Sequence, residues 1–117
     1  MEGIQMTQSV FTIDKHPTKF IYEVLTAGET FSIPSADLTD DDKTFLVSQA
    51  LVSVDGDSGT IVRYRIDPDT ARTGQSGHYL THGDEIMLRN PTAIANFRAY
   101  CEDAGQGTTV IRVTLLG

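Results

Sequence analysis

The sequence predicts an all-β fold: a single antiparallel β-sandwich, jelly-roll-like, of about eight short strands. Clusters of Gly, Pro, Asp and Asn cut the chain into short pieces. The pieces between them are rich in Val, Ile, Thr, Tyr and Phe, and their apolar side chains alternate with polar ones. Helical periodicity is weak, and we expect only single turns of helix, at 91–96 and 40–44.

The alternation is clearest in the segment 60–67, where Val62, Tyr64 and Ile66 fall on one face and are separated by charged residues. The segment 46–54 alternates in the same way. An Asp-Gly turn separates the two segments, and this combination is typical of a β-hairpin. We therefore predict that 46–54 pairs with 60–67 and that the three apolar side chains point into the core.

A second hairpin is predicted near the C-terminus, on either side of the AGQG turn at 104–107. The expected inward positions on its strands are Phe97, Ala99 and Cys101, followed by Ile111, Val113 and Leu115. Further strand candidates lie at 10–13, 20–25, 29–33 and 86–88. The segment 68–84 is expected to be one long loop, and loops of that length often carry contacts.

The chain of 117 residues is long enough for one domain with its own core. We expect a sandwich domain at 11–117, preceded by a possible N-terminal arm at 1–10. No secretory signal is recognised and no apolar run reaches membrane-spanning length, so we expect synthesis in a cytoplasm and no membrane partner. The net charge is −7 with nine scattered basic residues, which argues against nucleic acid as a partner.

The strongest metal candidates are His78, His82 and Asp84, because imidazole and carboxylate groups are ligands for zinc and iron. A strand places residues four apart about 13 Å from each other, so only a tight bend would bring the histidines together. Polar loop residues are the simpler interpretation. We expect no metal site and no cofactor.

Catalysis has one nucleophile candidate, Cys101, the only cysteine of the chain. It lies on the predicted inward face of a strand, where a cysteine usually behaves as a small apolar residue. No nucleophile elbow, phosphate loop or dinucleotide fingerprint occurs. We therefore expect a binding or structural module and not an enzyme.

A surface rich in Arg and Tyr is the best candidate for a protein interface. Arg63 and Arg65 project from one predicted strand, and Arg98 and Tyr100 project from another. If the two strands are neighbours, these side chains form one surface of a composition that is enriched at interfaces. We also expect His78 and Tyr79 to belong to the protein interface. The alternative is a solvated sheet face with cross-strand ion pairs.

The second half of the chain resembles small β-sandwich virion proteins of tailed bacteriophages. The resemblance covers roughly residues 46–116. It rests on the runs VRYRID at 62–67, GHYLTHGDEIML at 77–88, AIANFRAYCED at 93–103 and TVIRVTLL at 109–116. In that group a strand with flanking arginines precedes a Gly-His turn, a Gly-Asp turn and an Ile-x-x-Phe-Arg strand.

The resemblance implies a component of the virion. Its first implication is a capsid decoration (cement) protein on the capsid surface, bound to the major capsid protein and often trimeric, with an N-terminal arm that orders on a neighbour. A tail, neck or baseplate attachment protein is the alternative within the same class. A glycan- or receptor-binding sandwich is another, although the chain has no Trp and four Tyr.

Overall fold

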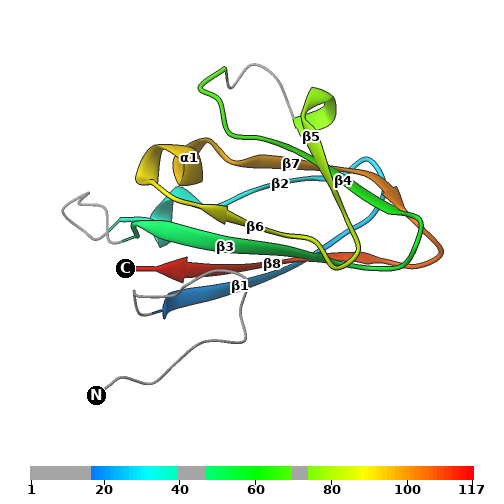
Figure 1. Ribbon diagram of the computed structural model, residues 1–117, viewed down its shortest axis with the longest axis horizontal. Coiled ribbons are helices and arrows are strands. Elements are labelled where there is room, and N and C mark those ends of the chain that lie inside the picture. The colour runs from blue at the N-terminus through cyan, green and yellow to red at the C-terminus, as the bar shows by residue number, and fades with distance from the viewer. Residues whose placement is uncertain (1–16, 40–46, 70–73) are drawn as a thin grey trace.

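The computed structural model describes residues 17–39, 47–69 and 74–117, which form two antiparallel four-stranded sheets packed face to face (Figure 1). Sheet A has the order β1 (Pro17–Leu25), β8 (Thr109–Leu116), β3 (Gln49–Asp55) and β6 (Glu85–Leu88). Sheet B has the order β2 (Thr30–Ser32), β7 (Arg98–Ala104), β4 (Thr60–Arg65) and β5 (His78–Thr81). The predicted all-β sandwich is confirmed.

The strand order is that of a jelly roll. In the first half of the chain, β1 and β3 lie in sheet A and β2 and β4 lie in sheet B. In the second half the assignment is reversed: β5 and β7 lie in sheet B, and β6 and β8 lie in sheet A. The pairs β1–β2, β3–β4, β5–β6 and β7–β8 therefore each cross from one sheet to the other. In both sheets every hydrogen-bonded neighbour runs antiparallel.

Both predicted hairpins are wrong. Strands β3 and β4 are consecutive but lie in opposite sheets, and the same holds for β7 and β8. Strand β3 pairs with β8 and β6, whereas β4 pairs with β7 and β5. Period-two alternation shows which side chains face the interior, but a strand in either sheet points the same residues inward. The sequence pattern is therefore the same for a hairpin and for a crossing between sheets.

The core lies between the sheets and is built from the alternating positions. The predicted inward residues Ala50, Val52, Val54, Val62, Phe97, Ala99, Cys101, Ile111, Val113 and Leu115 are all buried. Tyr64 is half-buried and its ring stacks on Phe97, with the centroids 6.0 Å apart. Ile66 was expected inside and is 42% exposed, because β4 ends at Arg65 and the chain turns away from the interior.

The segment 68–84 contains a strand that the sequence did not reveal. Its described residues include a 3-10 turn, η2 (Gly74–Ser76), followed by β5. Only four residues long, β5 buries a single large apolar side chain, that of Leu80, so its pattern is too brief to stand out. One further 3-10 turn, η1 (Ser35–Asp37), follows β2.

The predicted turn of helix at 91–96 is present as α1 (Pro91–Asn96). Asn90 caps it by accepting a hydrogen bond from the Ala93 N–H at 2.8 Å, and Pro91 occupies the first helical position. The predicted strand at 10–13, the turn at 40–44 and the arm at 1–10 lie outside the described residues. None of the helices described has the length and apolar character needed to cross a bilayer.

Asp57 ties together two of the crossing connections, β3–β4 and β7–β8, which lie at the right-hand end of Figure 1. Its carboxylate accepts hydrogen bonds from the backbone N–H of Gln106 at 2.7 Å, in the β7–β8 connection, and of Gly59 at 2.9 Å, in the β3–β4 connection. These two donors hold the pKa of Asp57 below its usual value. Below them the buried hydroxyls of Thr60 and Thr109 lie 3.4 Å apart, one from each sheet. The sandwich is thus closed by polar contacts at this end.

Candidate interaction surfaces

The outer face of sheet B carries the side chains that the sequence picked out for an interface. Strands β4 and β7 are neighbours, and Arg63 lies directly opposite Tyr100, as Arg65 lies opposite Arg98. On the other side of β4, Arg63 lies opposite Tyr79 of β5. The two strands are therefore neighbours, as a shared Arg/Tyr surface requires. We call Arg63, Arg65, Tyr79, Arg98 and Tyr100 the sheet B surface.

His78 does not belong to the sheet B surface. It pairs across the strands with Tyr64, whose ring points into the sandwich, and the two rings lie 5.7 Å apart at their centroids. His78 therefore projects from the inner side of the edge strand β5, where it stays exposed.

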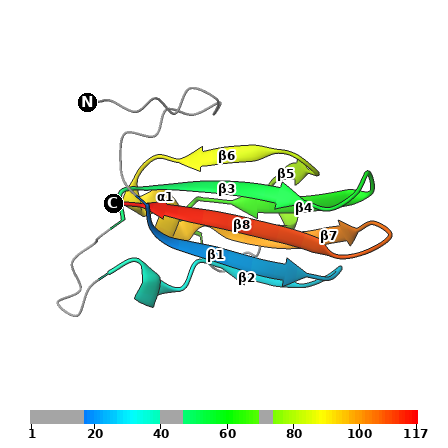
Figure 2. The same cartoon turned by 90° about the horizontal axis from the view of Figure 1, so that it is seen from below.

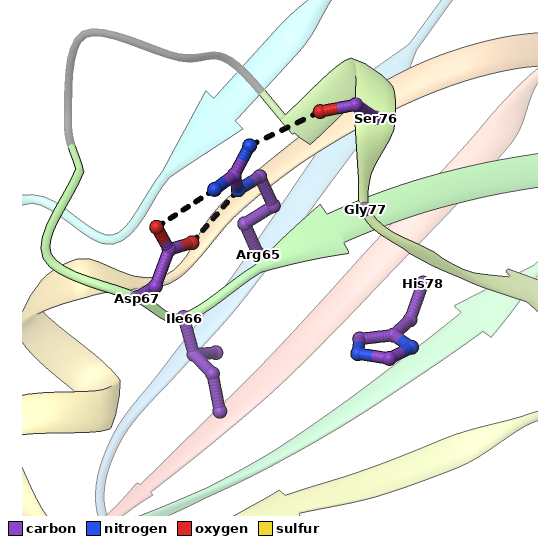
Figure 3. Close-up of a pocket in the computed structure, with 6 residues that line it drawn as sticks. All are labelled: Arg65, Ile66, Asp67, Ser76, Gly77 and His78. Atoms are coloured by element: carbon purple, nitrogen blue, oxygen red, sulfur yellow. Dashed lines mark hydrogen bonds and ion pairs between the residues drawn. The ribbon is translucent and has the colours of Figure 1, made fainter.

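The arginines of the sheet B surface are bound to partners in the same chain. Arg65 donates to both carboxylate oxygens of Asp67, at 2.7 and 2.8 Å, and to the hydroxyl of Ser76 at 3.1 Å (Figure 3). Arg98 donates to Asp67 Oδ1 at 3.2 Å and to the backbone carbonyls of Asp67, Asp69 and Asn96. The Arg65 guanidinium holds the pKa of Asp67 well below its usual range.

Arg63 is also engaged. Its Nε donates to Glu102, its guanidinium also reaches the carbonyl of Gly77 at 3.3 Å, and its charge lies 5.1 Å from the centre of the Tyr79 ring. The hydrogen bond with Glu102 raises the pKa of Arg63. A partner that used these arginines would first have to replace contacts that already satisfy them. The alternative of cross-strand ion pairs on a solvated face therefore describes this surface well.

An open hollow of about 420 Å³ borders the sheet B surface and is lined by Arg65, Ile66, Asp67, Ser76, Gly77 and His78. Figure 3 shows Arg65 turned toward Asp67 and Ser76, while Ile66 and His78 form a separate wall. Arg65 donates hydrogen bonds to two of the hollow's own residues, Asp67 and Ser76. The hydroxyl of Ser76 accepts a hydrogen bond from Arg65, and Figure 3 shows it turned away from His78.

The three metal candidates lie in three different settings. His78 contacts the Tyr64 ring. His82 Nδ1 is 3.1 Å from Asp55 Oδ1 and 3.0 Å from the backbone N of Gly56. Asp84 accepts hydrogen bonds from the backbone N–H and the hydroxyl of Thr81, which shapes the β5–β6 turn. Within 17–39, 47–69 and 74–117, no three His, Cys, Asp or Glu side chains come together in a metal-binding group.

Cys101 lies in the core on β7 and is fully buried. Burial raises the pKa of its thiol, which keeps the thiol protonated and weakens it as a nucleophile. Its packing among apolar side chains is sufficient to explain its place in the sequence.

The outer face of sheet A presents a different surface, which the sequence analysis missed. Phe20, Tyr22 and Val24 of β1 are 56%, 54% and 44% exposed. Each lies opposite a residue on the outward side of β8, and the row continues over β3 and β6, the strands that Figure 2 shows in front. We call the following residues the sheet A surface: Phe20, Tyr22, Val24, Val110, Arg112, Thr114, Leu51, Ser53, Asp55, Glu85 and Met87.

The exposed apolar side chains of the sheet A surface are concentrated on β1, and its polar side chains lie on β8, β3 and β6. Its one cation, Arg112, lies 5.3 Å from the centre of the Tyr22 ring and donates to Asp55 Oδ2 at 2.8 Å. That hydrogen bond lowers the pKa of Asp55. A signal for this surface does exist in the sequence: residues 20–25 read FIYEVL, with apolar side chains at both parities. A strand that is apolar on both faces is either covered on both or exposes one apolar face for binding.

A scan against protein-family models and a search of curated proteins gave no match to this sequence.

Proposed function

We propose that this protein is a non-catalytic binding module that docks on another protein through the sheet A surface. The observation that carries the proposal is the exposed strip of Phe20, Tyr22 and Val24 on β1. Contiguous apolar and aromatic surfaces on small soluble domains are typical of protein interfaces, and an arginine beside a tyrosine is a frequent component of them.

Within that class we propose a virion structural protein, and specifically a capsid decoration protein that binds the major capsid protein at the outer surface of the shell. The resemblance of residues 46–116 to small phage β-sandwich proteins supports this assignment. The jelly-roll strand order adds little by itself, since viral capsid domains, lectins and cupins all use it. A decoration protein stabilises the shell by burying surface that bridges neighbouring subunits.

The sheet B surface is the competing docking site, and two tyrosines allow a matched test. Tyr22 on sheet A and Tyr79 on sheet B are 54% and 60% exposed, and each has an arginine near its ring. We expect Tyr22→Ser to lower the occupancy of this protein on purified particles by about ten-fold or more, as removal of an interface aromatic does. Tyr79→Ser is the control and should leave occupancy unchanged.

The measurement is the copy number of each variant in purified particles, by quantitative mass spectrometry. A copy number comparable to that of the major capsid protein supports shell decoration. A few copies per particle would place the protein at the neck, tail or baseplate instead. Absence from particles would reject the virion assignment, and a loss confined to Tyr79→Ser would move the docking site to the sheet B surface.

A further inference from the structure

Three of the four sheet edges are short, and one is long. The edge strands β2, β5 and β6 have three, four and four residues, whereas β1 has nine. Short edge strands are one of the ways in which proteins prevent edge-to-edge pairing. Within residues 17–39, 47–69 and 74–117, the order of sheet A ends at β1, which is hydrogen-bonded to one strand, β8 (Figure 2). Pro17 and the register shift between Pro17 and Lys19 interrupt only the first residues of β1, so the stretch from Lys19 onward is the long edge among the described strands.

We propose that two copies of this chain associate through the edges of β1, in an antiparallel pair with its two-fold axis at Ile21. The proposal does not depend on the identity of any virion partner. It is carried by the side chains on the inner side of β1, where Lys19 and Glu23 lie two residues before and two residues after Ile21. A cation and an anion placed symmetrically about one residue are self-complementary under a two-fold rotation.

In this register the cross-strand pairs around the two-fold axis are favourable. Lys19 of one copy faces Glu23 of the other, and the two-fold axis repeats that pair. On the outer side Phe20 faces Tyr22, and at the axis Ile21 faces its own copy. Opposite charges, aromatic pairs and β-branched pairs are the combinations that stabilise antiparallel neighbours.

The other registers lose these pairs. A shift by one residue turns the inner side chains of one copy to the outer face. An antiparallel arrangement centred on Tyr22 places Ile21 opposite Glu23 and leaves Lys19 opposite Leu25. A parallel arrangement places like charges opposite each other, Lys19 against Lys19 and Glu23 against Glu23, which is unfavourable. The charges therefore select one arrangement and disfavour pairing with unrelated strands.

Lys19 has room for the second carboxylate. Its ammonium pairs with Asp37 of η1 at 2.5 Å, yet its side chain remains 50% exposed. Glu23 is exposed as well. Pairing the two β1 strands would extend sheet A to a continuous sheet of two copies and bring their strips of Phe20, Tyr22 and Val24 side by side. The exposed strip of β1 would then be doubled and presented on one face.

Sedimentation velocity of the purified protein over a range of concentrations tests the pairing. We expect a monomer–dimer equilibrium that Glu23→Lys weakens on the order of ten-fold, because both symmetric ion pairs become repulsive. The exchange of the two charges, Lys19→Glu with Glu23→Lys, should restore dimerisation. Glu85→Lys, on the opposite edge of sheet A, is the matched control and should have no effect. Circular dichroism melts confirm that each variant folds.

A cross-linking experiment tests the register directly. The register places residue 20 opposite residue 22, so a mixture of the Phe20→Cys and Tyr22→Cys variants should form a covalent dimer on oxidation, whereas either variant alone should form little. The native Cys101 is fully buried and does not compete. A protein that stays monomeric at all concentrations overturns the proposal, as does a trimer, or a dimer that the Lys19 and Glu23 variants leave unchanged. These measurements involve no particles, so their failure leaves the proposed docking function standing.

Discussion

The two outer faces of this sandwich have opposite chemistry although they belong to one small domain. On sheet B, the arginines at 63, 65 and 98 are held by carboxylates, carbonyls and a hydroxyl of the same chain. On sheet A, the strip of Phe20, Tyr22 and Val24 is exposed, with a single Arg112–Asp55 pair beside it. We infer that the first face mainly stabilises the fold and that the second is available for binding.

The comparison shows that residue type is a poor guide to a docking surface when partners are ignored. Arg and Tyr are enriched at interfaces, and both faces contain an arginine next to an exposed tyrosine. The difference lies in what the polar groups already contact. Replacing satisfied hydrogen bonds gives a partner little net free energy, whereas covering exposed apolar surface is favourable in itself.

The largest expected difference is between the arginines of the two faces. Arg98→Met should lower the free energy of unfolding by about 2–3 kcal/mol, because the guanidinium makes charged hydrogen bonds that Met does not replace. Its side chain is 12% exposed. Arg112→Met should cost less than about 1 kcal/mol, as expected for an exposed pair. Urea denaturation of both variants measures the difference, and equal losses would contradict the division of roles.

A second prediction concerns the connection that holds the two faces in one rigid body. Gly105 has φ +69°, and a Cβ there would lie 1.8 Å from Asp57 Oδ1. Gly28 has φ +90° with no atom within 4 Å of its Cβ position. Gly28→Ala should therefore cost about 1 kcal/mol for its backbone alone. Gly105→Ala should cost roughly 2 kcal/mol, because it also displaces the Asp57 tie.

Thermal or urea denaturation of the two glycine variants isolates the contribution of the tie. If both alanine substitutions cost the same, Asp57 does not hold the β3–β4 and β7–β8 connections together.

The sequence was sufficient for the fold class and most of the core, because period-two burial is a local property. Val52, Val62 and Val113 were placed inside from alternation alone, and all three are fully buried. Alternation does not show to which of the two sheets a strand belongs. Both hairpins were predicted wrongly, since a crossing between sheets and a hairpin need the same alternation and similar turns.

The candidate surfaces were predictable only in part. The neighbourhood of Arg63 and Tyr100 was anticipated, but their engagement with partners such as Glu102 depends on strand register. The exposed strip on β1 was missed because FIYEVL was recognised only as a strand candidate and its two apolar faces were not considered. Its exposure follows from the position of β1 at the edge of sheet A, which only the topology reveals.

The smallest expected difference appears in acid, in the comparison of two carboxylates whose pKa an arginine lowers: Asp67 on sheet B and Asp55 on sheet A. The pKa of Asp67 on sheet B lies well below its ordinary value of 3.8, mainly because of Arg65, and the pKa of Asp55 on sheet A is lowered less, mainly by Arg112. A carboxylate with a depressed pKa binds fewer protons in the folded chain than in the unfolded chain. Its stabilising contribution is complete above the ordinary pKa and is lost as the pH falls below it.

Urea denaturation at a series of pH values from about 5 to about 3 should therefore show wild-type stability falling with decreasing pH. Asp67→Asn should flatten that decline more than Asp55→Asn does, because an amide does not titrate and Asp67 has the more strongly depressed pKa. The quantity to compare is the loss of unfolding free energy between about pH 5 and about pH 3, since both substitutions also lower stability at neutral pH by weakening an arginine contact. A steeper remaining decline in Asp67→Asn than in Asp55→Asn would place the stronger ion-pair network on sheet A and reverse the assignment of the two faces.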